Sequence, residues 1–254
     1  MFIRAEQIKI FEHAAWRQFE EEMVAHSQSF APELCEVIGD EQLRVALRSA
    51  MTLAEGYGFT NRGPVRLFVE MMFLCGSAFD TDPQYPALGA VLRAPGDQMQ
   101  RAQQIHEGFL DYLEKVSGPG AVHVQKALSD LLTYTRTPLA FSNDLVADML
   151  RDMHRIFPRK AAYVGRPGLV ALIDEGIAEA WQYRFDTPRQ TALLVVLKFA
   201  FGHGCTSDPL YPWIARTLHD ERIVDPAARA ARLEKKAITW LEHVVAANQQ
   251  GSQT

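Results

Sequence analysis

The sequence predicts an all-α fold, built from two tandem helical units in one elongated or two-lobed bundle. Apolar residues recur at helical spacing along most of the chain, and no stretch shows the sustained alternation typical of a half-buried strand. The chain also resembles itself, because residues 19–92 align without a gap with residues 145–218, which lie 126 positions further on. A chain of 254 residues allows one large domain or two small ones, and the repeat favours two.

The repeat is densest where Asp82-Pro83-Gln84-Tyr85-Pro86 meets Asp208-Pro209-Leu210-Tyr211-Pro212. Ser117-Gly118-Pro119-Gly120 is the clearest helix breaker between the copies. We therefore expect a first unit at residues 1–117, a linker at 118–120, a second unit at 121–247 and a frayed polar tail at 248–254. Each unit should contain about five helices. Other matched pairs are Pro32 and Pro158, Gly39 and Gly165, Tyr57 and Tyr183, Phe59 and Phe185, Phe73 and Phe199, and Gly76 and Gly202.

The first helix that repeats is expected at residues 41–57, with its counterpart at 167–183. Leu43, Leu47 and Ala54 recur there at helical spacing. Asp40 precedes this stretch and is expected to act as its N-cap, because a carboxylate can accept hydrogen bonds from the free amides of a first turn.

The central helix of each unit is expected at residues 64–75 and 188–201. The second copy has the stronger start signal, since Thr187, Pro188 and Gln190 form the pattern of a capping box. Both stretches are apolar nearly all round, which predicts central burial. Gly76 and Gly202 follow them and are expected to form left-handed C-terminal caps.

Aspartate-proline pairs mark the expected starts of the later helices. Asp82 and Asp208 are expected to cap short helices that begin at Pro83 and Pro209, and Asp225 is expected to cap the last helix. Long helices should close the units at residues 98–116 and 225–247. Residues 121–134 should form the first helix of the second unit.

Charge and cysteine content exclude several classes of protein. The net charge of −5, from 26 Lys and Arg against 31 Asp and Glu, has the wrong sign for a nucleic-acid-binding chain. Cys35, Cys75 and Cys205 are widely spaced, so neither a disulfide framework nor a zinc site is indicated. No apolar stretch approaches the length of a membrane span, and no secretory signal precedes the first helix. We therefore expect a cytoplasmic protein.

No common catalytic motif is present, and we expect no enzymatic activity, no cofactor and no metal. Two weak candidates exist. Asp80 and Asp82 could contribute to a site for a hard cation, but the second copy keeps only Asp208, so capping is the favoured interpretation. His203 and Cys205 could form an activated thiolate, but the first copy has Ser77 and Phe79 there, so structural roles are favoured.

The candidate partner contacts are aromatic and basic. Tyr85 and Tyr211 follow the central helices and either contact a partner or pack against their own helices. Trp213 is not duplicated, which makes it the better interface candidate. The last helix carries a basic face that is either solvated or bound to an acidic protein, formed by Arg229, Arg232, Lys235 and Lys236.

Written as a pattern, the repeat resembles a known family. Phe30-Ala31-Pro32, Tyr57-Gly58-Phe59, Phe73-Leu74-Cys75-Gly76 and Phe79-Asp80-Thr81-Asp82-Pro83 are similar to a helical module of bacterial proteins encoded beside type VI secretion spike, PAAR and effector genes. Similar modules also occur attached to effector-loading adaptors. The resemblance covers residues 19–116 and 145–244, and the second copy departs from the acidic form of the last motif.

This resemblance implies a non-catalytic protein-binding role, as an adaptor or chaperone for a type VI effector or a spike-associated protein. The groove between the two copies and the loops after the central helices would form its binding surface. One alternative is an immunity protein, whose acidic surface would block a basic toxin. The other is an all-α hydrolase built on His203 and Cys205.

Overall fold

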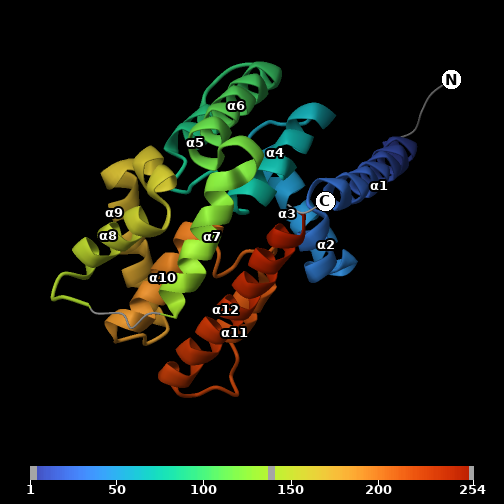
Figure 1. The fold of residues 1–254 in the computed structure, drawn as a ribbon. Helices are drawn as coiled ribbons and strands as arrows, with labels where there is room; N and C mark the ends of the chain where they lie inside the picture. The colour runs from blue at the N-terminus through green and yellow to red at the C-terminus, as the bar shows by residue number, and fades with distance from the viewer. Residues whose placement is uncertain (1–4, 137–140, 252–254) are drawn as a thin grey trace.

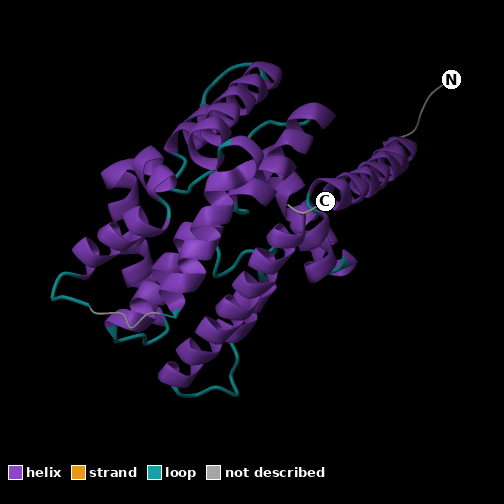
Figure 2. Cartoon of the chain, viewed as in Figure 1, coloured by secondary structure: helices purple, strands orange, loops and turns teal. Residues whose placement is uncertain are grey.

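A computed structural model describes residues 5–136 and 141–251, with side chains described for 14–136 and 141–246. These ranges form twelve α-helices, one π-helical segment, one 3₁₀ segment and no strand, which confirms the all-α prediction (Figures 1 and 2). The α-helices are α1 (Ala5–Phe30), α2 (Pro32–Ile38), α3 (Asp40–Gly56), α4 (Arg62–Cys75), α5 (Pro86–Arg93), α6 (Gln98–Tyr112), α7 (Val122–Thr135), α8 (Leu145–Ile156), α9 (Pro158–Gln182), α10 (Pro188–Phe201), α11 (Pro212–Leu218) and α12 (Pro226–Gly251).

The helices form one body from which α1 extends (Figure 1). In that view α8, α9 and α10 lie on the side opposite to α1, and α7 and α12 cross the space between them. No helix in the described part of the chain combines the length and the hydrophobicity that crossing a membrane requires.

The larger hydrophobic core contains residues from both sides of the predicted linker. Phe68 and Phe79 from the first half pack with their ring centroids 4.8 Å apart, and the same core includes Phe185 and Leu210 from the second half. A smaller core joins α8, α9 and α10. Buried residues from both sides of the predicted linker therefore belong to one continuous core. The predicted linker is a sharp turn, with Gly118 at a φ of 70°.

The central helices are buried, as predicted, and their ends meet at two glycines. Gly76 follows α4 with a φ of 94°, and Gly202 follows α10 with a φ of 97°. A Cβ on Gly76 would lie 2.5 Å from the carbonyl oxygen of Phe201, and one on Gly202 would lie 2.7 Å from that of Cys75. Both ψ values are near 155°, so these residues are not the left-handed helical caps that we expected. Glycine is needed here for positive φ and for close backbone contact.

Two predicted caps are present. The Thr187 hydroxyl accepts a hydrogen bond from the Gln190 backbone N–H, and the Gln190 side chain accepts one from the Thr187 backbone N–H, which completes the capping box. The Asp225 carboxylate accepts bonds from the backbone N–H groups of Ala227 and Ala228 at 3.1 and 3.2 Å.

The other three aspartates were assigned wrongly. Gly39 is the N-cap of α3, and Asp40 lies inside the helix, where its carboxylate accepts a bond from Gln28 Nε2 at 3.1 Å. Asp82 and Asp208 close tight turns, and the short helices α5 and α11 begin later, at the second proline of each motif. The reason is tertiary, because each carboxylate also accepts a hydrogen bond from the opposite half of the chain.

Three helix boundaries also differ from the prediction. The helix expected at 98–116 is α-helical only to Tyr112 and continues as the π-helical segment Leu113–Ser117. α9 begins at Pro158, earlier than expected, and is interrupted at Gly165, which has a φ of 72°. α12 continues to Gly251 through most of the predicted tail, and residues 252–254 lie outside the described residues.

Candidate functional site: a basic and aromatic hollow on α11 and α12

The candidate site is a surface hollow of about 420 Å³ between α11 and α12. Its α12 residues follow helical spacing, so they share one face of that helix. This hollow brings together four of the seven residues that the sequence proposed as partner contacts. Its lining consists of Trp213, Arg232, Lys235, Lys236, Thr239, Trp240 and His243.

The local sequence explains why this face of α12 remains outside the core. Ala230, Leu233 and Leu241 are buried and fix the opposite face of the helix, while Arg232 and Lys235 are exposed. α11 begins at Pro212, which places Trp213 in its first turn and against α12.

Aromatic packing holds the two tryptophans of the hollow. The Phe201 ring meets Trp240 edge to face, with centroids 4.7 Å apart, and meets Trp213 at 6.2 Å. The Tyr211 ring lies 6.4 Å from Trp240. Within the described residues, the buried indole N–H of Trp213 has no hydrogen-bond partner. The hollow therefore has a rigid apolar wall backed by the core.

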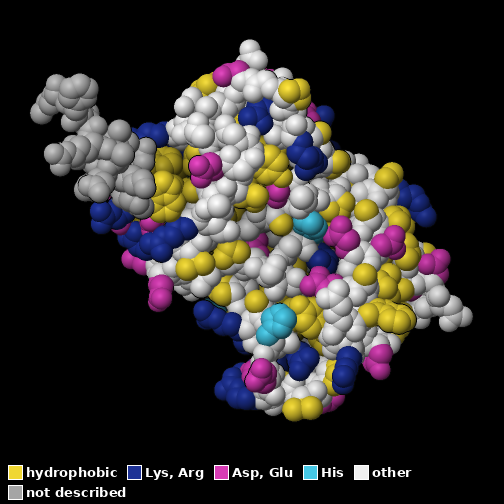
Figure 3. All heavy atoms as spheres, turned by 180° about the vertical axis from the view of Figure 1, so that it is seen from behind, with side chains coloured by type: hydrophobic (Ala, Val, Ile, Leu, Met, Phe, Trp, Pro, Cys, Tyr) yellow, Lys and Arg dark blue, Asp and Glu magenta, His cyan; other side chains and the backbone are white. Residues whose placement is uncertain are grey.

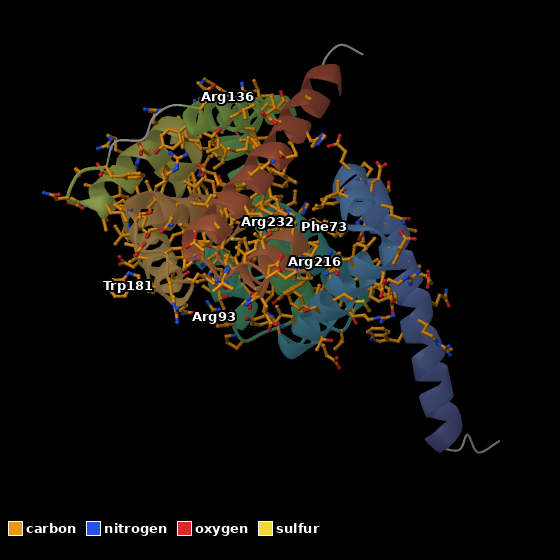
Figure 4. The ribbon with its side chains drawn as sticks, turned by 90° about the horizontal axis from the view of Figure 1, so that it is seen from below. Phe73, Arg93, Arg136, Trp181, Arg216 and Arg232 are labelled. Carbon is orange, nitrogen blue, oxygen red and sulfur yellow. The ribbon has the colours of Figure 1, made fainter. Side chains whose placement is uncertain are left out.

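The positive charges in and beside the hollow repel one another. Burial lowers the pKa of Lys236, and the charges of Arg232 and Arg216 lower it further, while Asp220 opposes them. The Lys236 ammonium donates a hydrogen bond to Thr217 Oγ1 at 2.9 Å. Figure 4 shows the labelled Arg216 and Arg232 close together on this side of the molecule.

The carboxylate of Asp220, which lies near Lys236, is already bonded to Arg222. Its two oxygens accept hydrogen bonds from Arg222 Nε and Nη2 at 2.8 and 2.9 Å, and this contact lowers the pKa of Asp220 to about 2. Among the side chains that line the hollow, three are cationic and none is acidic. In the view from behind, several Lys and Arg side chains lie at the lower end of the molecule, among acidic and hydrophobic ones (Figure 3). The hollow is thus suited to bind carboxylates beside an apolar surface.

The three remaining predicted partner contacts have structural positions. Arg229 is half-buried, and its Nη2 donates to the Ile223 carbonyl oxygen at 2.6 Å. Tyr85 and Tyr211 are only 5% and 8% exposed, so neither ring can contact a partner at the surface. Both tyrosines are packed inside the protein, which agrees with the alternative prediction that they pack against their own helices.

The sequence search missed Trp240, His243 and Arg216. Trp240 and His243 continue the spacing of Arg232, Lys235 and Lys236 along α12, and this signal could have found them. Trp181 was also missed, although it is 77% exposed at the end of α9 and far from the hollow (Figure 4). No pattern around Trp181 distinguishes it from a core residue.

The weaker chemical candidates are held in structural contacts. Cys205 is fully buried, and burial raises the pKa of its thiol far above its usual value, so the thiol stays protonated. The His203 ring contacts Glu175 through Nδ1 at 3.0 Å and the Ala78 carbonyl oxygen through Nε2 at 3.1 Å. Neither of these contacts joins the His203 ring to the Cys205 thiol. All three cysteines are buried and free.

The paired carboxylates of the first half are also committed. Asp80 accepts a hydrogen bond from the Tyr57 hydroxyl at 2.7 Å, and Asp82 accepts from the Gln84 backbone N–H at 2.8 Å. The residues with described placement include no group of three or more His, Cys, Asp or Glu arranged to hold a metal ion.

Comparisons of the chain with models of protein families, with characterised proteins and with solved structures found no match.

Proposed function

We propose that this chain is a non-catalytic protein-binding protein that contacts an acidic segment of its partner through the hollow on α11 and α12. The observation that carries the proposal is the convergence of Trp213 and Trp240 with Arg232, Lys235 and Lys236 in a lining that has no acidic side chain. Tryptophan and arginine are the residues that most often dominate binding energy in protein interfaces.

The repulsion within the hollow gives such binding a driving force. The charges of Arg216 and Arg232 disfavour the charged form of Lys236, and Asp220, the nearby carboxylate, is held by Arg222. A partner carboxylate placed among these cations would relieve the repulsion and form charge-assisted hydrogen bonds. The indole rings would bury apolar area of the same partner.

An acidic protein suits the hollow better than a nucleic acid. The hollow is a small basic patch on a chain of net charge −5, and a nucleic acid would meet repulsion outside it. The sign of the hollow also disfavours the immunity hypothesis, because that hypothesis rested on an acidic surface facing a basic toxin.

We further propose that the partner is a type VI effector or a spike-associated protein and that the chain acts in the cytoplasm as its adaptor or chaperone. The support is the resemblance of the repeated motifs to the modules encoded beside such genes. In place of the groove between the copies, the binding surface is assigned here to the hollow, because the loops after the central helices are packed against each other.

Two fused copies of one helical unit remain part of this proposal. Backbone angles at positions 126 residues apart support it. Gly39 and Gly165 have φ and ψ of 76° and 161° against 72° and 163°. Tyr85 and Tyr211 have −131° and 50° against −123° and 54°. Because the basic hollow lies only in the second half, binding would depend on where the copies differ.

The test is coexpression of the chain with the product of the neighbouring effector gene, followed by gel filtration. A defined complex that requires the hollow is expected, so Arg232→Glu with Lys235→Glu should abolish it. Arg159→Glu with Arg166→Glu is the matched control, since it makes the same charge change on exposed residues of α9. An effector that is soluble and loads normally without this chain would contradict the proposal, as would protection from the toxin with no effect on secretion.

A further inference from the structure

A second cavity, of about 250 Å³, lies beneath α7, between that helix and α10 and α12. Its walls are mainly aliphatic and aromatic. Val124, Leu128 and Leu131 line it from α7, Leu193 and Val196 line it from α10, and Ile238 lines it from α12. For comparison, an apolar cavity of about 150 Å³ is large enough to bind benzene.

Four polar side chains at the border of this cavity are paired within the protein. The Tyr134 hydroxyl donates to Asp152 Oδ2 at 2.5 Å, and Thr135 Oγ1 donates to the Leu132 carbonyl oxygen at 2.8 Å. Arg189 and Glu234 form an ion pair at 2.6 Å. A charged ligand would have to break that pair or enter without a partner of its own, which is costly in an apolar site. The cavity therefore favours an uncharged ligand.

The first half of the chain does not contain the same arrangement. In the alignment of the last helices, Phe109 corresponds to Ala237, and Phe109 is buried while Ala237 lines the cavity. Glu70, which lies 126 positions before Val196, lines an open polar hollow with Arg66, Gln103 and His106. At the positions where the first half has a large ring and a carboxylate, the second half thus has small or apolar side chains.

α7 covers this apolar surface and has no counterpart within the aligned residues. Val124, Leu128 and Leu131 recur at helical spacing on one face of α7, yet each is only partly buried. A helix that existed only to close the core would bury this stripe. These three side chains instead line the cavity with their exposed surface.

We propose that the cavity beneath α7 is a binding site for a small uncharged apolar molecule, such as an aromatic hydrocarbon or a neutral alkyl chain. Recognition would come from shape and buried apolar area, because the lining is mainly aliphatic and aromatic. This site is separate from the proposed protein contact, although Trp240 lines both.

The test is titration of the full chain with 1-N-phenylnaphthylamine, an uncharged dye that fluoresces in apolar surroundings. Saturable binding with one site per chain is expected, with displacement by 1-decanol. Ala237→Phe should fill the cavity and weaken binding by at least about tenfold, and Val196→Phe should do the same from α10. The matched control is Ala231→Phe, which changes an exposed position of α12, the helix that carries Ala237. This variant should bind the dye as the native chain does.

Dye binding should also raise the melting temperature of the native chain, and a folded Ala237→Phe variant should lose this shift. Absence of saturable binding to the native chain would overturn the proposal. So would unchanged affinity in both filled variants with their helical content intact. Displacement by decanoate but not by 1-decanol would show a charged-ligand site and would equally overturn it.

Discussion

The carboxylate of Asp82 accepts the backbone N–H of His203 at 2.8 Å, which joins the loop after α4 to the loop after α10. A matching contact joins the same two loops in the opposite direction. The Asp208 carboxylate accepts hydrogen bonds from the Ser77 backbone N–H at 2.8 Å and from the Ser77 hydroxyl at 2.6 Å. Both carboxylates are buried. These contacts fix the two halves against each other and bury much of both loops, although Thr81 and Ser207 stay exposed.

Replacement of Asp208 by alanine should therefore destabilise the whole fold. The substitution leaves the backbone N–H groups of Ser77 and Leu210 without their acceptor. We expect the free energy of unfolding to fall by about 2 to 4 kcal/mol, because these donors are part-buried or buried. Asp225→Ala, which removes only an exposed cap, should cost about 1 kcal/mol. Urea denaturation measures both, and equal losses would contradict the structural role of Asp208.

Lys160 should make stability depend on pH. Its ammonium is buried, donates to the Phe199 carbonyl oxygen and lies over the rings of Phe199 and Tyr85. Burial lowers the pKa of Lys160 to about 8, against 10.5 in its ordinary state. Between these values the unfolded chain binds more protons than the folded chain, so the contribution of this group rises with pH from about 8 to 10.5.

Lys160→Met removes that contribution. We expect the stability of the variant relative to the native chain to fall by on the order of 2 to 3 kcal/mol between pH 7 and pH 10, because only the native chain gains stability as Lys160 loses its proton. The comparison between variant and native chain cancels the opposite effects of the buried tyrosines and cysteines. Denaturation of both proteins at pH 7, 8, 9 and 10 measures it. A difference that does not change with pH would show that Lys160 titrates normally.

Arg184→Gly should stabilise the fold. Arg184 has a φ of 60°, while Gly58, the residue 126 positions earlier, has a φ of 74°. A side chain is strained in this region and glycine is not, and the Arg184 side chain is exposed. The free energy of unfolding should rise by about 0.5 to 1 kcal/mol. Thermal denaturation checks this, with Arg159→Gly inside α9 as a control that should lower the melting temperature.

Trp213→Phe should be nearly neutral for stability. The substitution keeps an aromatic ring against Phe201 and removes an indole N–H that has no hydrogen-bond partner in the described structure. We expect a change within about 1 kcal/mol, against a loss of about 2 to 3 kcal/mol for Trp213→Ala, which leaves a gap beside Phe201. A large loss in Trp213→Phe would mean that the indole N–H is bonded after all. Chemical denaturation separates the two outcomes.

Local signals predicted much of this fold, and tertiary contacts decided the remainder. Thr187 and Gln190 form a capping box whose partners are all close in sequence, so the start of α10 could be predicted. Asp82 and Asp208 have the same local pattern as caps, but their carboxylates bond the opposite half of the chain. A single sequence does not specify such a contact.

The candidate site, like the fold, could be predicted only where its signals are local in the sequence. The basic face of the last helix was evident from residue spacing, but its conjunction with Trp213 depends on how α11 packs against α12. The burial of Tyr85 and Tyr211 depends likewise on the shared core. The cavity beneath α7 depends on three helices from distant parts of the sequence, and no local pattern marks it.

Isothermal titration of the chain with its proposed partner, a type VI effector, tests the central claim most directly. The account predicts that Arg232→Glu with Lys235→Glu weakens binding at least about tenfold, that Arg159→Glu with Arg166→Glu has no effect, and that added salt weakens native binding. Equal affinities for all three chains, independent of salt, would contradict the claim that the hollow on α11 and α12 binds an acidic partner.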